Sequence, residues 1–144
     1  MRGTEKKRNA KLKEDLVFDS WAILAYVQAE PGGAHVKSLL LETTEIRRPL
    51  LISNINLGEV WYMLARRNSP DYASRQLAEL AQIGLERVDV DWPMVLQAAD
   101  YKSRHRISYA DAFAAALAKQ RNAELVTGDQ EFRPLETEIQ IHWV

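Results

Sequence analysis

Residues 16–20 read Leu-Val-Phe-Asp-Ser, and residues 125–129 read Leu-Val-Thr-Gly-Asp. In both stretches an apolar run, typical of a buried β-strand, is followed within two residues by an aspartate. Residues 50–53, Leu-Leu-Ile-Ser, form a third such run, and residues 85–90 and 139–144 alternate between apolar and polar side chains as strands do. The sequence therefore predicts five short strands.

Helical patterns fill most of the chain between these strands. Ser20 and Asn54 are the predicted N-caps after the first and second strands, and Ser69-Pro70-Asp71 is typical of a helix start. Gly84 and Asn122 are predicted left-handed stops. The predicted helices span residues 21–29, 34–43, 55–67, 70–83, 92–105 and 109–121. Strands and helices that alternate in this way predict one α/β domain with a mostly parallel sheet.

The composition is that of an ordinary globular domain. The chain has 144 residues, a formal net charge of -1 and no cysteine, which excludes a disulfide framework, a thiolate metal site and a cysteine nucleophile. No apolar run approaches the roughly 20 residues that span a bilayer, so we expect a cytoplasmic protein without membrane contact. Residues 1–15 are basic and nearly devoid of large apolar side chains, which predicts a flexible arm or an appended segment outside a domain of residues 16–144.

Four carboxylates fall where such a sheet would bring them together. Asp19 directly follows a predicted strand and Asp129 lies two residues past another, whereas Glu59 and Asp111 lie near the starts of helices. In open parallel sheets, ligands bind beyond the carboxyl ends of the strands. Gathered carboxylates repel one another, and a divalent cation removes that repulsion. Because no cysteine or paired histidine is nearby, Mg²⁺ or Mn²⁺ suits this set better than Zn²⁺, and such an ion supports phosphodiester hydrolysis.

Each acid also has a purely structural interpretation. Asp111 stands three residues after Ser108, as in a variant of the capping box, and Asp129 in Thr-Gly-Asp is an ordinary turn residue. Asp19 could cap the helix that follows it. Glu59 could be a solvated helix acid, although its apolar neighbours leave little of that helix surface polar. Spacing alone leaves both interpretations open.

The four acidic segments together resemble the PIN-domain family, and most closely its small VapC-like toxins. The resemblance covers residues 16–144, and the ordered set of four motifs is more specific than any one of them. The motifs are Leu16-Val17-Phe18-Asp19-Ser20, Ile52-Ser53-Asn54-Ile55-Asn56-Leu57-Gly58-Glu59-Val60, Ile107-Ser108-Tyr109-Ala110-Asp111-Ala112-Phe113-Ala114-Ala115-Ala116 and Leu125-Val126-Thr127-Gly128-Asp129-Gln130-Glu131-Phe132. The basic arm is the one departure from a compact member of the family.

This resemblance implies a single PIN-like domain with a five-stranded, mostly parallel sheet flanked by helices. It also implies a Mg²⁺- or Mn²⁺-dependent endoribonuclease that leaves a 5′-phosphate and a 3′-hydroxyl. Asp19 and Asp111 are the expected direct metal ligands, and Glu59 and Asp129 would bind through water or a second ion. The hydroxyls of Ser20 and Thr127 would orient carboxylates or waters. VapC-like toxins are usually homodimers neutralised by an antitoxin protein, so the same partners are expected here.

RNA has to be held mainly through its phosphates. The candidate contacts are basic residues at helix ends: Arg66, Arg67, Lys102, Arg104 and Arg106. Arg47, Arg48 and the basic residues of the arm are further candidates. Solvated helix ends are the alternative interpretation, because cations are favoured at helix C-termini in any case. His35, His105 and His142 show no ligand spacing in the sequence and are assigned no role.

Other functions fit the sequence less well. A haloacid-dehalogenase-like phosphatase would need a second aspartate two residues after the first, where Trp21 stands. A response-regulator receiver would need a lysine after a late strand, and no P-loop motif is present. A non-catalytic PIN-like module that binds RNA or protein would be marked by the loss of acids, and all four are present. The choice between RNA and DNA as substrate cannot be read from the sequence.

Overall fold

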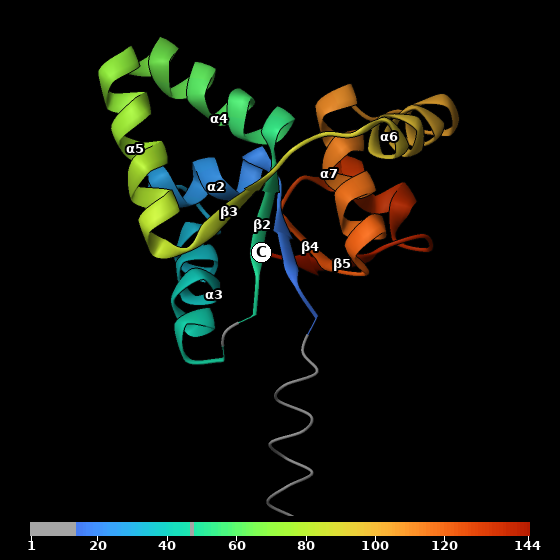
Figure 1. Cartoon of the computed structure of the whole chain (residues 1–144), viewed down its shortest axis with the longest axis horizontal. Helices are drawn as coiled ribbons and strands as arrows, with labels where there is room; N and C mark the ends of the chain where they lie inside the picture. Colours follow the sequence, from blue (N-terminus) through green and yellow to red (C-terminus); the bar gives the residue numbers. More distant parts are fainter. Residues whose placement is uncertain (1–13, 47) are drawn as a thin grey trace, which may run out of the picture.

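Five strands form one sheet in the computed structural model, which describes residues 14–46 and 48–144 (Figure 1). The strands are β1 (Leu16–Phe18), β2 (Leu50–Ser53), β3 (Leu85–Val88), β4 (Glu124–Thr127) and β5 (Gln140–Trp143). They lie in the order β3-β2-β1-β4-β5, and every pairing is parallel. The sequence-based prediction of an α/β domain with a five-stranded sheet is confirmed, and the sheet is entirely parallel.

The direction of the strand order reverses at β1. From β1 the chain adds β2 and then β3 on one side, and it later places β4 and β5 on the other side. At such a reversal the connections leave adjacent strands in opposite directions, and a crevice opens beyond the carboxyl ends of those strands. Here the reversal lies at β1 and β4, so a ligand would be expected just after Phe18 of β1 and Thr127 of β4.

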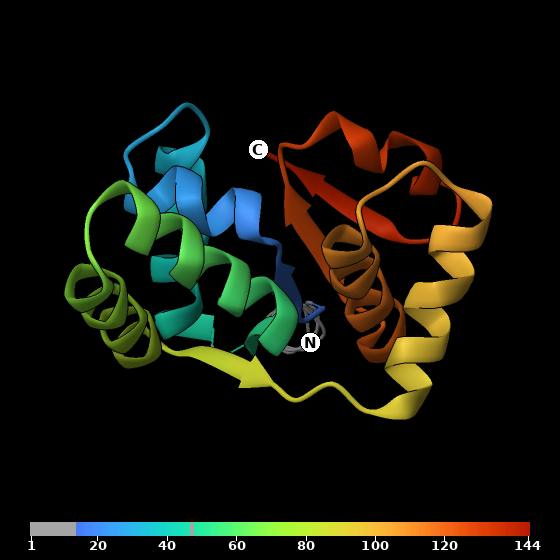
Figure 2. The same cartoon turned by 90° about the horizontal axis from the view of Figure 1, so that it is seen from above.

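Helices cover both faces of the sheet, as the view from above shows (Figure 2). One face carries α2 (Ser20–Val27), α3 (Gly33–Ile46), α4 (Asn54–Arg67) and α5 (Pro70–Ile83), and the other carries α6 (Trp92–Arg104) and α7 (Tyr109–Arg121). Each face has its own apolar cluster: Val17 and Leu125 pack toward α7, whereas Phe18 and Val126 pack toward α2 and α4. Because these strands are buried on both faces, their sequences are continuous apolar runs and do not alternate between apolar and polar residues.

Helix α7 owes its position to its alanines. All residues from Asp111 to Ala118 are buried, and five of these eight are alanine. Small side chains allow the helix backbone to lie close to both α6 and the sheet, so that little of α7 except its two ends reaches solvent. The first turn of this helix, which carries Asp111, is therefore fixed relative to β1.

Two predicted caps were wrong by one residue. The N-cap of α2 is Asp19 rather than Ser20, and the N-cap of α4 is Ser53 rather than Asn54. In both cases the last residue before the helix is extended, and its side-chain oxygen accepts a backbone N–H from the first turn. In both cases the helix begins one residue earlier than predicted, so the predicted cap is already helical. The predicted caps Ser69 and Ser108 and the left-handed stops Gly84 and Asn122 are confirmed.

Other bounds differ from the prediction at the ends of elements. The third and fifth strands are shorter than residues 85–90 and 139–144. A 3₁₀ helix η1 (Gln130–Leu135) directly follows the predicted turn at residues 128–129, in a segment for which no element was predicted. The backbone carbonyl of Asp15 accepts the N–H of Glu124 at 3.0 Å, so this residue of the predicted arm already contacts the sheet. Residues 1–13 of the predicted arm lie outside the described residues.

Candidate functional site

Asp19 lies where β1 and β4 end and is fully buried. Its Oδ1 accepts the backbone N–H of Ala22 at 2.8 Å, and its Oδ2 accepts the hydroxyl of Thr127 at 2.5 Å. The first contact caps α2, and the second ties the end of β1 to the end of β4. The structural interpretation of Asp19 as a cap is therefore confirmed, and the same carboxylate also links the ends of two central strands.

Asp111 enters the same region from the opposite layer. It lies in the first turn of α7, is 7% exposed, and donates its backbone N–H to the hydroxyl oxygen of Ser108 at 3.1 Å. Ser108 is thus the N-cap that the sequence predicted. The capping contact uses the backbone of Asp111, so it does not by itself explain why the carboxylate is buried.

Asp129 and Glu131 complete an acidic cluster with Asp111. One carboxylate oxygen from each of these three residues lies within 4.8 Å of the others, which is the spacing of ligands around one metal ion. Asp129 is held by two contacts: its N–H donates to the Thr127 hydroxyl at 3.0 Å, and its Oδ1 accepts the N–H of Glu131 at 3.0 Å.

Glu131 is the site residue that sequence reasoning missed. It stands two residues after Asp129, and it turns toward Asp111 only because η1 begins at Gln130. A six-residue 3₁₀ helix that contains Pro134 has no clear periodic pattern, so the direction of the Glu131 side chain could not be predicted from it. The one available signal was the presence of a second acid within the fourth motif.

Glu59 reaches the site from α4 and is positioned by Ser20. The hydroxyl of Ser20 donates to Oε1 of Glu59, which links the first turn of α2 to the second turn of α4. The electrostatic field of Glu59 also acts on Asp111. The two predicted supporting hydroxyls, Ser20 and Thr127, therefore each donate to a predicted site carboxylate.

Burial and mutual repulsion raise the proton affinity of two of these acids. Desolvation raises the pKa of Asp19 to about 8, against the opposing effect of its bonds to Thr127 and Ala22, and the charges of Asp111 and Asp129 raise it further. Desolvation likewise raises the pKa of Asp111 to about 7, helped by Asp129 and Glu59. A group of oxygen ligands that resists ionisation in this way fits a hard divalent cation, whose charge removes the repulsion.

A buried polar bridge joins the two helical layers beside the acids. Asn56, in the first turn of α4, is fully buried and donates its side-chain N–H to the carbonyl of Ala110 at 3.0 Å. Its Oδ1 accepts the hydroxyl of Ser53 at 2.5 Å. Ala110 directly precedes Asp111, so this amide fixes the start of α7 relative to α4. Asn56 belongs to the second acidic motif, and no role was predicted for it from the sequence.

The predicted RNA contacts differ in their availability. Arg104 is paired with Asp100 and with both carboxylate oxygens of Glu138, and Lys102 donates to the carbonyl of Ile107 at 2.6 Å. Arg106 is exposed and forms no ion pair with another described residue.

The two arginines that end α4 also have neighbours. Arg66 lies over the ring of Tyr62 at 5.1 Å, and Arg67 contacts Gln28 and lies 3.7 Å from Glu30. Arg47 and the basic residues among positions 1–13 lie outside the described residues. Among the predicted contacts, Arg106 therefore has the guanidinium that is most available to a phosphate.

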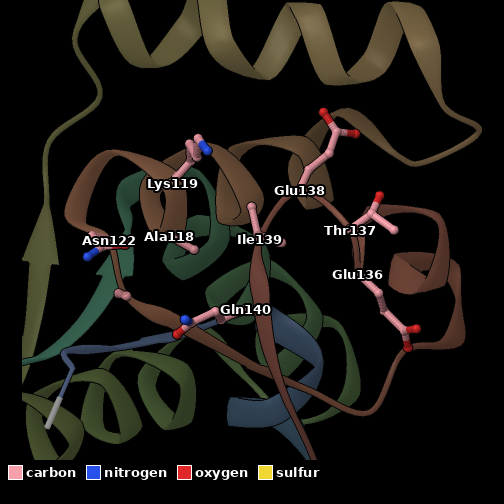
Figure 3. A pocket seen from close by; sticks show the side chains of 9 residues that line it. Ala118, Lys119, Asn122, Glu136, Thr137, Glu138, Ile139 and Gln140 are labelled. Carbon is pink, nitrogen blue, oxygen red and sulfur yellow. The ribbon is translucent and has the colours of Figure 1, made fainter.

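A separate pocket lies between the C-terminal end of α7 and the segment that leads into β5 (Figure 3). Its labelled side chains include Lys119, Asn122, Glu136, Thr137 and Glu138. None of the predicted site carboxylates lines this pocket. No helix in the described part of the chain is long and apolar enough to cross a membrane.

Solved structures with the same fold include toxin–antitoxin complexes. The chain is 19% identical to the VapBC structure from Salmonella typhimurium bound to DNA, with a TM-score of 0.69 and coverage of 90% of this chain and 97% of that one. It is 21% identical to Mycobacterium tuberculosis VapC20, described as a toxin that cleaves the sarcin–ricin loop, with a TM-score of 0.65 and coverage of 87% and 96%. FitAcB from Neisseria gonorrhoeae is 22% identical, with a TM-score of 0.62 and coverage of 88% and 95%.

These identities establish a shared fold and no more. No curated protein shows significant sequence similarity to the chain. The family model of the PIN domain, however, matches residues 16–136, which is most of the sequence and includes all the acids described above. On this match, and with the VapC-like fold that the structure comparisons show, the chain belongs to the PIN domain family.

Proposed function

We propose that this protein is a Mg²⁺- or Mn²⁺-dependent endoribonuclease and the toxin of a toxin–antitoxin pair. The observation that carries the proposal is the acidic cluster of Asp111, Asp129 and Glu131. Asp19 is not one of these three but is buried nearby, and burial and repulsion raise the pKa of both Asp19 and Asp111. Maintaining buried acids next to one another destabilises a fold unless a ligand compensates, and phosphodiester hydrolysis is the chemistry that such a cation supports.

The residues divide into ligands and positioning groups. Asp19 and Asp111 are the proposed direct ligands, and Asp129 and Glu59 act through water or a second ion. Glu131 joins this set because of its distance to Asp111 and Asp129. A bound divalent cation would supply Lewis acidity toward the phosphodiester and a more acidic water. Thr127 and Ser20 keep the carboxylates of Asp19 and Glu59 in place through their hydroxyls.

The proposed partners follow from the same family. Several of the matching solved structures are complexes of a VapC toxin with its antitoxin. We propose a cognate antitoxin that covers the crevice of this chain and a homodimer as the active form. RNA is proposed as the substrate, held in part by Arg106, and the protein is proposed to act in the cytoplasm.

Thermal unfolding with and without Mn²⁺ is the first test of the metal site. The wild type should melt higher with the ion, because a cation that binds only the folded state adds roughly 2.7 kcal/mol at a hundredfold excess over its dissociation constant. The variant Asp19→Asn with Asp111→Asn should melt higher without metal and ignore the ion. Asp71→Asn, at an exposed acid on α5, is the matched control and should respond like the wild type.

Cleavage of an end-labelled RNA then tests the activity. The wild type should cut RNA only with Mg²⁺ or Mn²⁺ and leave 5′-phosphates, and the double variant should not cut. A DNA oligonucleotide of the same sequence separates the two substrates. If the wild type shows neither metal-dependent melting nor cleavage, the acids serve as caps, and the alternative of a non-catalytic PIN-like binding module takes the place of this proposal.

A further inference from the structure

His35 and His142 lie side by side although 106 residues separate them in the sequence. Their Nε2 atoms are 3.1 Å apart, and their rings meet edge to face with centroids at 5.1 Å. His35 belongs to the first turn of α3 and is exposed, whereas His142 belongs to the edge strand β5 and is half-buried. The sequence showed no ligand spacing for either histidine, because the pairing depends on the position of β5 next to α3.

Glu124 fixes the second ring nitrogen of His142. Its Oε2 lies 3.3 Å from Nδ1 of His142, across the pairing of β4 with β5. A carboxylate only accepts hydrogen bonds, so in the neutral ring the proton of His142 stays on Nδ1 and a lone pair stays on Nε2. That lone pair points at His35. Among proteins that bind metals through histidine, a carboxylate in this position is the usual partner that orients the ring.

The distance between the two Nε2 atoms suits a shared metal ion. Nitrogen ligands lie roughly 2.0–2.1 Å from a zinc ion, which places two of them roughly 2.9–3.4 Å apart for angles between square and tetrahedral. The observed 3.1 Å falls inside that range. Imidazole nitrogen favours zinc, copper or nickel over magnesium or manganese, whose preferred ligands are oxygens.

The backbone on both sides of the pair is already fixed. The N–H of Val144, two residues after His142, donates to the carbonyl of Thr127 at 3.1 Å. Gly33, at the start of α3, lies so close to α2 that an added Cβ would meet the carbonyl oxygen of Ala25 at 2.2 Å. Figure 2 shows the C-terminus beside the connection between α2 and α3. Both histidines therefore project from segments whose positions depend on other contacts.

We propose that His35 and His142 form a binding site for a divalent transition-metal ion of the zinc, copper or nickel class. The two Nε2 atoms are the protein ligands, solvent completes the coordination, and Glu124 orients His142. In the metal-free protein the N–H on Nε2 of His35 donates to the lone pair of His142. Metal binding would require a lone pair on both Nε2 atoms, so the proton on Nε2 of His35 would move to Nδ1 of the same ring. This site shares no residue with the carboxylate cluster and does not depend on the proposed nuclease activity.

Titration of the untagged protein with Cu²⁺, followed by electron paramagnetic resonance, tests the proposal directly. A copper ion held by two imidazoles shows nitrogen superhyperfine splitting, and one held by carboxylates does not. The wild type and the variant Asp19→Asn with Asp111→Asn should both show the nitrogen signal, and in each protein that signal should saturate at one copper ion per chain. His35→Ala and His142→Ala should each lose it. Glu124→Gln should weaken binding by roughly tenfold or more, because it removes the partner that orients His142.

His105→Ala is the matched control. The chain has three histidines, and the ring of His105 contacts Glu138 at 2.8 Å instead of another imidazole. This variant should keep the two-nitrogen signal. Loss of the signal in His105→Ala, or its persistence in both His35→Ala and His142→Ala, would overturn the proposal. Circular dichroism of each variant without metal establishes that the substitutions leave the fold intact, since His35 is exposed and His142 is at an edge strand.

Discussion

At the scale of single residues, the burial of Asp19 makes the stability of the fold depend on pH. Its pKa is raised to about 8 in the folded chain from an ordinary value of 3.8. Between these two values the folded state retains a proton that the unfolded state has released. The free energy of unfolding therefore falls as the pH rises through this window. Asp111, with a pKa raised to about 7, acts in the same direction.

Without metal, the protein should thus become less stable from pH 5 to pH 8. The expected loss is up to about 1.4 kcal/mol per pH unit for each of the two carboxyls. Urea unfolding in EDTA at several pH values measures it. Asp19→Asn with Asp111→Asn should remove most of the slope, and saturating Mn²⁺ should flatten it in the wild type. A slope that is unchanged in the double variant would mean that other groups cause it.

The buried side-chain amide of Asn56 is a second single-residue feature whose removal has a measurable effect. Asn56→Ala should lower the free energy of unfolding by roughly 2–3 kcal/mol, because the Ser53 hydroxyl and the Ala110 carbonyl are left without their partner. It should also weaken the response to Mn²⁺, since Ala110 leads into Asp111. Chemical denaturation and metal titration measure both effects.

Asn54→Ala is the control for Asn56. The Asn54 side chain donates to Asp89 at the surface, and its removal should stay within about 0.5 kcal/mol. If Asn56→Ala lowered stability but left the metal response intact, the amide would be a packing element and would not position Asp111.

At the scale of elements, the turn after β4 is fixed by the indole of Trp21. A Cβ added at Gly128 would lie 2.1 Å from Cη2 of that ring, so Gly128→Ala forces the turn or the ring to move. Overpacking of this kind costs roughly 1–3 kcal/mol, and the turn carries Asp129. We expect Gly128→Ala to lower both stability and Mn²⁺ affinity, as measured by thermal unfolding with and without the ion.

Gly58→Ala is the matched control for Gly128→Ala. A Cβ at this position in α4 meets nothing within 4 Å, so Gly58→Ala should stabilise the chain by roughly 0.5–1 kcal/mol through helix propensity. Trp21→Leu combined with Gly128→Ala should restore part of the metal response. If the double variant responds no better than Gly128→Ala alone, the ring is not what holds the turn.

Two arginines near the C-terminal end of α6, Arg104 and Arg106, differ in their ion pairs. Arg104 already neutralises Asp100 and Glu138, whereas Arg106 is free of ion pairs with the described residues. Arg106→Ala should weaken RNA binding at every sequence and reduce the slope of log affinity against log salt by about 1. Arg104→Ala should leave that slope unchanged. Fluorescence anisotropy at several salt concentrations distinguishes them, and equal slopes for all three proteins would exclude Arg106 as a phosphate contact.

Most of the strands and helices could be predicted, because local chemistry determines where they begin and end. The four predicted acids could be placed near the ends of these elements for the same reason. Apolar runs set the strands, and Ser69, Ser108, Gly84 and Asn122 set helix ends. The parts that escaped prediction depend on tertiary contacts. Glu131 joins the cluster through a short 3₁₀ turn, and His35 meets His142 only because β5 packs beside α3. Neither arrangement leaves a periodic signal in the sequence.

At the scale of the whole molecule, two apolar clusters share one sheet. β1 lies at its centre with all three residues buried, whereas β3 is an edge strand whose Glu86 and Arg87 are exposed. Backbone amides in β1 and β4 should therefore exchange with solvent only on global unfolding, and those in β3 should exchange earlier. Hydrogen exchange followed by mass spectrometry measures this order. Equal protection of β3 and β1 would show that a second chain covers this edge in solution.

The double use of Asp19 has a genetic consequence. One of its oxygens caps α2 and the other holds Thr127, so most replacements at this position would disturb the fold along with the site. Asparagine keeps an acceptor for the cap and removes the charge, and a single-base transition converts either aspartate codon into an asparagine codon. If the proposed activity depends on Asp19, a gene copy that produces folded but inactive protein is thus one nucleotide away, and its product would go on occupying the proposed antitoxin.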